Sequence, residues 1–388
     1  MGIIITIVTF FFILGIIVLV HEAGHFVAAR RGGIKVEEFG LGLPPRVFGM
    51  YKDVDGKWKL VGPKTPSATN TIWSLNWIPL GGFVKIKGEE GQLASDPDSF
   101  ANKSIGRRMW VLSAGVSMNV VLAMVLLTIG LMIGLPQALD DTTIPAVARV
   151  SDEEIRIVQV LEGSPAAKAG LTSADRLVSI DDQHFTEIEP LQNYIDSKIG
   201  ETVTLQIERK GDMVSSELVP EILPETERGG MGVALVRVGL VSYPWYVAWW
   251  YGISQTFQMI GAILVGFFMI IKSLIVSQQL IGEVYGPVGI ATLVGDAVDL
   301  GFLYVLQLTA ALSVIIAVIN YLPFPALDGG RVLFLMIEAI RRKPINQKIE
   351  AALHNAGFAL LMILVLIVTY RDIARISGGF FDRVIGLF

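Results

Sequence analysis

Residues 3–31 read IIITIVTFFFILGIIVLVHEAGHFVAARR, and this stretch decides the class of the protein. It begins with a long uncharged apolar run and ends with Arg30 and Arg31. A membrane-crossing helix needs about 20 mostly apolar residues, so the run is long enough to span a bilayer. A secretory signal peptide carries basic residues before its apolar core, whereas here they follow it. We therefore predict a retained span over about residues 3–29, with its N-terminus outside.

The composition of the whole chain agrees with a membrane protein. Of the 388 residues, 52% are hydrophobic and 17% are charged, and the mean hydropathy is +0.58. Soluble domains carry about 25% charged residues, so the composition argues against a wholly soluble protein. The formal net charge of −5 gives no support to a nucleic-acid partner, and we predict none. Cysteine is absent, so any metal must bind to histidine, aspartate or glutamate.

Residues 21–25 of the first predicted span match the pattern H-E-x-x-H. On a helix, His21 and His25 lie about 40° apart around the axis and about 6 Å apart along it, so both imidazoles can reach one cation. Glu22 is then placed to activate a water molecule. The alternative is that these side chains only extend to the water at a helix end. Each ionisable residue at mid-bilayer costs about 2.5–3.5 kcal/mol, which metal coordination would compensate.

A zinc site for hydrolysis has three protein ligands and one open position. Asp328 is the strongest candidate for the third ligand, because it follows an apolar segment that ends on the same side as the histidine pair. The alternative is a turn, since Asp-Gly-Gly is typical of turns. His184 belongs to the predicted outer domain. His354 begins the last span, where we predict a structural or interfacial role.

Four spans are predicted in all, over about residues 3–29, 110–135, 303–322 and 353–370. Basic residues flank the loop between the first two spans and fill the loop before the last, which is typical of cytoplasmic loops. If the third span runs inward, the apolar residues 244–276 do not cross once. We therefore predict an interfacial or re-entrant segment within residues 244–300, and a fifth span stays an alternative.

Residues 137–243 differ from the rest of the chain. They hold 19 acidic and 9 basic residues, a net charge of −10, which leaves +5 for all other residues. Strand-like runs at 156–161, 176–181 and 202–209 and a helical run at 190–199 predict a soluble α+β domain. The second span leaves the cytoplasm, so we expect this domain on the outer side.

Several motifs resemble, in order along the chain, the site-2 protease family of intramembrane zinc metalloproteases, especially its bacterial envelope-stress branch (regulator of sigma-E protease-like). The motifs are His21–His25, the Gly-rich segments at 39–42 and 79–88, residues 113–119, residues 286–290 and residues 320–330. The acidic domain resembles a bacterial PDZ domain through residues 162–171 and 175–181. Members of this branch can carry two PDZ domains, and one is evident here.

The resemblance implies a polytopic α-helical membrane protein with membrane-associated β-hairpins at 32–106 and an inserted α+β PDZ domain at 137–243. The metalloprotease core is then divided between residues 1–136 and residues 301–388. His21, His25 and Asp328 would bind Zn²⁺ and Glu22 would activate water. Asn320 matches the position that holds the substrate backbone, and its alternative role is helix packing. Asn119 is interpreted as a packing residue by preference.

The resemblance also implies substrates, partners and a location. The substrates would be single-span membrane proteins, such as an anti-sigma factor, or remnant signal peptides. Cleavage would occur in or near the transmembrane segment, with the lipid bilayer as a further partner and the PDZ domain binding or screening the substrate. The protein would be a multi-pass protein of the bacterial inner membrane. Its PDZ domain would be extracytoplasmic and its active site would lie towards the cytoplasm.

Two other classes of function stay open at this stage. One is a non-catalytic membrane scaffold that presents a PDZ domain and keeps a relic metal site. The other is a transporter in which intramembrane His and Asp side chains relay ions. The chain shows no inverted repeat and few spans, which argues against the transporter. The substitution Glu22→Gln separates a protease from both, because only a protease keeps its zinc and loses peptide cleavage.

Overall fold

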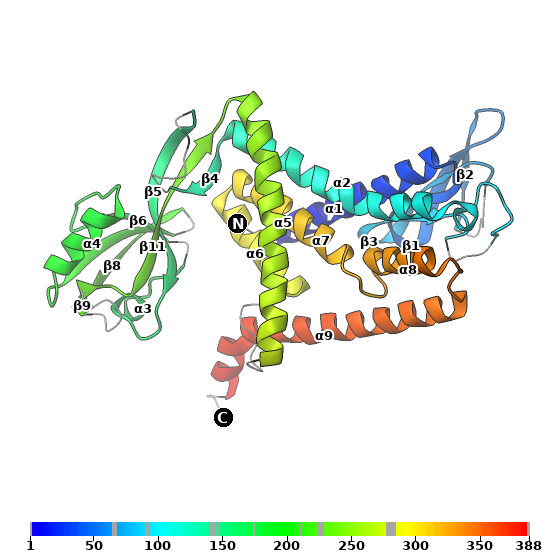
Figure 1. The fold of residues 1–388 in the computed structure, drawn as a ribbon. Helices are drawn as coiled ribbons and strands as arrows, with labels where there is room; N and C mark the ends of the chain where they lie inside the picture. Colours follow the sequence, from blue (N-terminus) through cyan, green and yellow to red (C-terminus); the bar gives the residue numbers. More distant parts are fainter. Residues whose placement is uncertain are drawn as a thin grey trace. The chain divides into compact units, whose positions relative to one another are not determined.

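A computed structural model describes residues 2–63, 68–89, 93–139, 145, 147–173, 175–209, 211–222, 229–276 and 285–385 (Figure 1). The chain divides into two compact units. The helical unit comprises Met1–Leu127, Gly252–Val298 and Val305–Phe388. The sheet unit comprises Thr128–Tyr251 and Asp299–Tyr304.

Long apolar helices dominate the helical unit. The helices are α1 (Ile3–Arg31), α2 (Ile105–Ile133), α5 (Trp245–Val276), α6 (Pro287–Leu300), α7 (Phe302–Asn320), α8 (Asp328–Arg341) and α9 (Gln347–Ile385), with a short 3₁₀ helix at Phe100–Asn102. Within the described residues, five of them (α1, α2, α5, α7 and α9) are long and apolar enough to cross a membrane. A helix satisfies its own backbone polar groups, which the bilayer interior requires. A polytopic membrane protein is confirmed, and the count of four spans stays a prediction.

Helix α5 occupies the segment predicted as interfacial or re-entrant. It is a single unbroken helix of 32 residues. A re-entrant path needs a turn, and residues 245–276 contain none, so its turn would have to follow them. The interfacial and the re-entrant alternatives both stay predictions. Residues 277–284, in the middle of the predicted 244–300 segment, lie outside the described residues.

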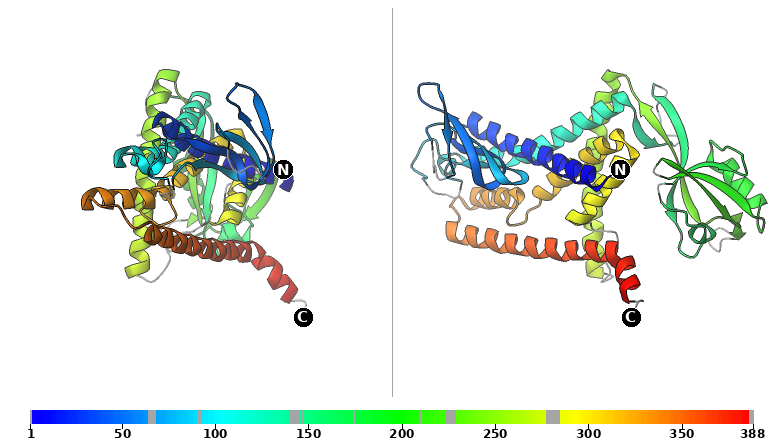
Figure 2. Two further views of the ribbon diagram at one scale, coloured as in Figure 1. Left: turned by 90° about the vertical axis from the view of Figure 1, so that its right-hand side faces the viewer. Right: turned by 180° about the vertical axis from the view of Figure 1, so that it is seen from behind.

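A three-stranded sheet fills most of the Gly-rich loop between α1 and α2. Its strands are β1 (Val36–Lys52), β2 (Trp58–Val61) and β3 (Ile72–Ile86), in the order β2-β1-β3. Gly40 of β1 is paired with Phe83 on one side and with Ser74 on the other, so the two halves of β3 flank the first half of β1. The sheet lies beside the C-terminal end of α1 (Figure 2). The sequence predicted a strand at 83–87, which falls at the end of β3.

One buried apolar cluster joins this sheet to the helices. It combines side chains from the end of α1, from β1 and β3, from the start of α2 and from α8: Ala28, Ala29, Ile34, Val36, Ile86, Phe100, Val111, Leu112, Val332 and Leu335. An ion pair of 2.6 Å between Arg108 and Glu338 links α2 to α8 beside it. The cluster therefore fixes α8 against α1 and α2.

The sheet unit contains a six-stranded antiparallel sheet in the order β4-β11-β5-β6-β7-β8. Its strands are β4 (Leu135–Ala138), β5 (Arg149–Val160), β6 (Arg176–Ile180), β7 (Val203–Arg209), β8 (Asp212–Leu218) and β11 (Val233–Ser242), and β9 (Glu221–Ile222) pairs with β10 (Gly229–Gly230). Helices α3 (Pro165–Lys168) and α4 (Ile188–Ser197) complete the unit. The Ser164 hydroxyl accepts the Ala167 N–H and caps α3. The three predicted strands and the predicted helix all occur, with shifted ends.

Asp175 is the most deeply buried carboxylate of the sheet unit among the described residues, with 1% of its surface exposed. The Arg209 guanidinium donates to both of its oxygens at 2.7 Å, and the Thr172 N–H donates at 2.8 Å. Burial alone would raise the pKa of Asp175, but Arg209 and Thr172 outweigh it and hold this pKa below its usual value. The carboxylate ties the loop before β6 to β7.

The substitution Asp175→Asn should destabilise the sheet unit by about 3 kcal/mol, because it leaves the Arg209 charge without its partner. The pKa of Asp175 is lowered on folding, so its contribution is complete above the unfolded pKa of about 4 and is lost as the pH falls below it. Hydrogen exchange of β6 and β7 amides in the full-length protein, measured between pH 7 and pH 3, tests this. In the variant, the protection of these amides should be lower at pH 7, and it should change less between pH 7 and pH 3. Equal protection of variant and parent at pH 7 would contradict the prediction.

Candidate metal centre

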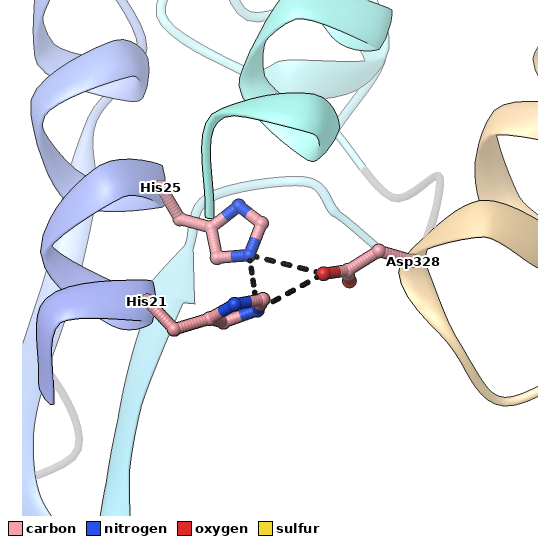
Figure 3. Close-up of side chains that lie close together, drawn as sticks. All are labelled: His21, His25 and Asp328. Atoms are coloured by element: carbon pink, nitrogen blue, oxygen red, sulfur yellow. Dashed lines mark hydrogen bonds and ion pairs between the residues drawn. The ribbon is translucent and has the colours of Figure 1, made fainter. Parts of the chain in front are cut away.

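Three ligand atoms from two distant segments meet in the helical unit (Figure 3). His21 Nε2 and His25 Nε2, one helical turn apart on α1, are 3.1 Å from each other. Asp328 Oδ2, at the start of α8, lies 3.0 Å from the first and 3.3 Å from the second. Both histidines are 7% exposed. Among the described residues, this is the only group of three or more His, Asp or Glu side chains with ligand atoms this close together.

The spacing of these atoms fits a tetrahedral metal ion. Zinc binds nitrogen and oxygen ligands at about 2.0–2.2 Å, which places two ligands of a tetrahedron about 3.3 Å apart. The three observed separations lie at or just below that value. Two imidazole nitrogens and one carboxylate also form a ligand set that zinc accepts, and they leave the fourth position open.

Hydrogen bonds on the far side of each ring orient the histidines. His25 Nδ1–H donates to the Val111 carbonyl oxygen at 2.9 Å, which leaves the Nε2 lone pair of the neutral ring free. His21 Nδ1 faces the side-chain amide of Asn119, whose Nδ2 lies 3.4 Å away. The Asn119 Oδ1 atom is buried and has no partner among the described residues. Rotating this amide end for end would let Oδ1 accept the Nδ1–H that metal binding through Nε2 requires.

Glycines on the facing helices leave room for the centre. A Cβ atom at Gly115 of α2 would lie 2.3 Å from His25 Nε2 and 2.8 Å from His21 Nε2. A side chain there would fill the space in which these two nitrogens can hold an ion. A Cβ atom at Gly24 would lie 2.4 Å from the Ala114 carbonyl oxygen, so both glycines are needed for the close approach of α1 to α2.

The third ligand atom depends on the turn between α7 and α8. Asp328 is the first residue of α8, where the helix dipole favours a negative charge. A Cβ atom at Gly329 or Gly330 would lie within 2.4 Å of carbonyl oxygens of the turn, so the turn folds tightly under α8.

A cavity of about 380 Å³ opens beside the three ligand atoms. Its lining includes Glu22, which follows the first histidine, and Phe83 and Val84 of β3. Glu89 and Arg331, which form an ion pair, also line it. The Glu22 carboxylate, strand β3 and a charged pair therefore border the same cavity as the candidate metal centre.

The structure brings together His21, Glu22, His25 and Asp328, the four residues to which the sequence assigned metal binding and water activation. Asn320 ends α7, eight positions before Asp328, and is not among the residues that line the described cavity. His354, which was interpreted as structural or interfacial, lines the cavity. Sequence reasoning also preferred packing for Asn119, which contacts His21. Its spacing of four from Gly115 on α2 was a signal that both face α1.

Comparisons with known proteins give a family and relatives. The family model described as Peptidase family M50 matches residues 9–364. Zinc metalloprotease RasP of Oceanobacillus iheyensis is 27% identical over 457 residues, covering 96% of this chain and 99% of its own length. A relative from Clostridium perfringens, whose name also describes it as a zinc metalloprotease, is 34% identical over 358 residues, covering 92% of this chain and 95% of its own length. A similarly named relative from Clostridium acetobutylicum is 30% identical over 360 residues, covering 92% of this chain and 94% of its own length.

Among solved structures, the PDZ domain of the SdrC-like protein of Listeria monocytogenes is 23% identical to the segment it matches. The match covers 22% of this chain and 92% of that chain, with a TM-score of 0.21.

The substitution Gly115→Ala should abolish tight metal binding, because its methyl group would occupy the space beside both Nε2 atoms. We expect the purified protein to retain less than about a tenth of the zinc bound by the parent, a loss in the range seen when support around a metal site is removed. Metal content by mass spectrometry measures this. Gly106→Ala is the matched control on the same helix, because a Cβ atom there meets nothing within 4 Å. Full zinc content in the Gly115 variant would show that the ion binds elsewhere.

Proposed function

Because the chain belongs to peptidase family M50, the site-2 protease family of zinc metalloproteases, we propose that His21, His25 and Asp328 hold its zinc ion and that Glu22 is its catalytic carboxylate. The observation that carries this proposal is the convergence of three ligand atoms at separations of 3.0–3.3 Å. Family membership also favours a protease over the scaffold and the transporter that the sequence left open.

The reaction proposed is hydrolysis of a peptide bond. When bound, zinc supplies Lewis acidity, which polarises the scissile carbonyl and makes water a stronger acid. Glu22 lies in the same cavity as the three ligands and is placed to take a proton from the attacking water. The water oxygen first adds to the carbonyl carbon, and the carbon–nitrogen bond breaks in a later step, in which the nitrogen takes up a proton. Glu22 then passes its proton to the departing amine.

The substrate backbone must be unwound to enter this cavity. A helical peptide pairs its own amides, so it offers a protease no free backbone groups. Strand β3 is at the edge of the three-stranded sheet, and its residues Phe83 and Val84 line the cavity. An edge strand has unpaired backbone groups that can pair with an extended peptide. We propose that β3 holds the unwound substrate in this way, with Asn320 as a further contact to its backbone.

The substrates that fit such a site are single-span membrane proteins, such as an anti-sigma factor, or remnant signal peptides. Their transmembrane segments are already in the bilayer that surrounds the long apolar helices. Cleavage in or near the transmembrane segment follows from the position of His21 and His25 on α1, a helix long and apolar enough to cross a membrane.

The sheet unit is proposed to be a PDZ domain that binds or screens substrates outside the cytoplasm. Its six-stranded antiparallel sheet with two short helices supports this assignment, together with the capped start of α3 at Ser164-Pro165. The net charge of −10 on residues 137–243 distinguishes this domain from the basic loops of the membrane core. A domain of this kind would admit only those substrates whose outer part is already short.

The topology proposed is a multi-pass protein of the bacterial inner membrane with four spans: α1, α2, α7 and α9. The metal ligands lie in the second half of α1 and directly after the end of α7, so these two helices run in the same direction. After α2 has returned, the segment before α7 must then cross an even number of times. An interfacial α5, anchored by Trp245, Trp249 and Trp250, meets this requirement. The basic loops support an active site towards the cytoplasm.

The substitution Glu22→Gln should leave the zinc content unchanged and lower the rate of peptide cleavage by about 10²- to 10⁴-fold, because the amide does not accept the proton from water. The assay uses the full-length protein reconstituted with a single-span substrate, and metal content is measured on the same sample.

Glu201→Gln is the matched control, since this exposed glutamate lies in the sheet unit and pairs with Lys198. It should cleave at the parental rate. Parental cleavage by the Glu22 variant would rule out Glu22 as the catalytic carboxylate.

A further inference from the structure

The turn that carries Asp328 has an unusual backbone. Ala326, two residues before the ligand, has a φ of 84°, in the left-handed region that residues with a Cβ atom rarely adopt. Such a conformation persists only where surrounding contacts hold it. The position of the Asp328 carboxylate relative to His21 and His25 therefore depends on whatever holds Ala326.

Helix α9 supplies that contact. The Ala326 N–H donates to Nδ1 of His354 at 2.9 Å, and these residues are 28 positions apart. The His354 ring also packs edge-on against Phe334 of α8, with 5.4 Å between ring centroids. One turn further along α9, a Cβ atom at Gly357 would lie 2.4 Å from the Pro325 carbonyl oxygen, so this glycine allows α9 to approach the turn. His354 thus touches the chain on both sides of Asp328.

The hydrogen bond defines the tautomer of His354. Because Nδ1 accepts a proton from Ala326, the proton of the neutral ring lies on Nε2. The Nε2 atom is buried and has no hydrogen-bond partner within the described residues. The ring lines the same cavity as His21, Glu22 and Asp328. A side chain that only fills space would not need the Nδ1 and Nε2 nitrogens of His354. In addition, an ionisable residue on an apolar helix is by default a candidate for function.

We propose that His354 is the positioning residue of the metal centre: its Nδ1 atom holds the Ala326 turn, and the turn holds Asp328 at the distance that a shared ion requires. This inference rests on the proposed assignment of Asp328 as a zinc ligand. It gives α9 a task beyond crossing the membrane. It also predicts that zinc affinity depends on a side chain that does not touch the ion.

The test compares two substitutions of equal shape, His354→Asn and His354→Leu, in the full-length protein. The Oδ1 atom of asparagine can reach the position of Nδ1 and accept the Ala326 N–H, whereas leucine offers no acceptor. The apparent zinc dissociation constant is measured by competition with a chelator. The leucine variant should bind zinc about 10- to 100-fold more weakly, as is typical when a group that orients a metal ligand is removed. The asparagine variant should recover most of that affinity.

A second readout is the visible absorption of the Co²⁺-substituted protein, which reports the coordination geometry. We expect the parental spectrum in the asparagine variant and a weaker, shifted band in the leucine variant. His354→Phe extends the comparison, since it keeps an aromatic ring against Phe334 and should nevertheless lose affinity. If this variant does not fold, the pair of equal shape decides the question alone.

His184→Phe is the matched control, because this histidine also bonds to the backbone, donating through Nδ1 to the Val178 carbonyl oxygen, but lies in the sheet unit. It should bind zinc as the parent does. Asp328→Asn tests the ligand assignment itself, and parental zinc affinity there would overturn the proposed function. Suppose that the Asp328 variant loses zinc, whereas the leucine variant of His354 binds zinc as tightly as the asparagine variant does. In that case only the positioning role is overturned.

Discussion

The proposed metal centre would depend on holding three unprotonated ligand atoms together in buried surroundings. Without an ion, the two imidazole nitrogens and the carboxylate have few protons to share, and their lone pairs point at one another. Burial makes such an arrangement costly unless a cation or hydrogen bonds compensate it. The rest of the helical unit can be understood as the structure that keeps His21, His25 and Asp328 in this arrangement.

The ligand side chains are contacted from behind by residues of other helices. His25 is oriented by a carbonyl of α2, and His21 faces the amide of Asn119 on the same helix. The Ser313 hydroxyl of α7 donates to the main-chain carbonyl oxygen of Asn119 at 2.8 Å, so α7 contacts the backbone of α2 at the residue that faces His21. The residues concerned lie on four helices, α1, α2, α7 and α8. Small displacements of a ligand weaken metal binding strongly, so the packing of these helices would affect the affinity for the ion.

The sequence predicted the local parts of this centre better than the long-range ones. The spacing of His21 and His25 is a property of one helix, so five residues of sequence suffice to predict that both can reach one ion. Asp328 was placed with them by counting membrane crossings, which gives the side of the membrane but not a distance. The contacts of Asn119 and His354 join segments 98 and 28 positions apart, and they depend on how helices pack. A polar residue in an apolar segment, such as Asn119 or His354, indicates a function, but the sequence does not show which residue it contacts.

Hydrolysis inside a membrane protein also requires that water reach the centre. The cavity beside the ligands is lined by Glu89 and Arg331, and both side chains are partly exposed. Charged groups keep much of their favourable energy only when hydrated, so an ion pair on a cavity wall favours a water-filled opening on that side. Glu89 lies three residues after the end of β3, and Arg331 lies one turn into α8. The edge strand β3 and the helix that carries Asp328 both border this cavity, so under the proposed function water and an unwound substrate would enter by the same route.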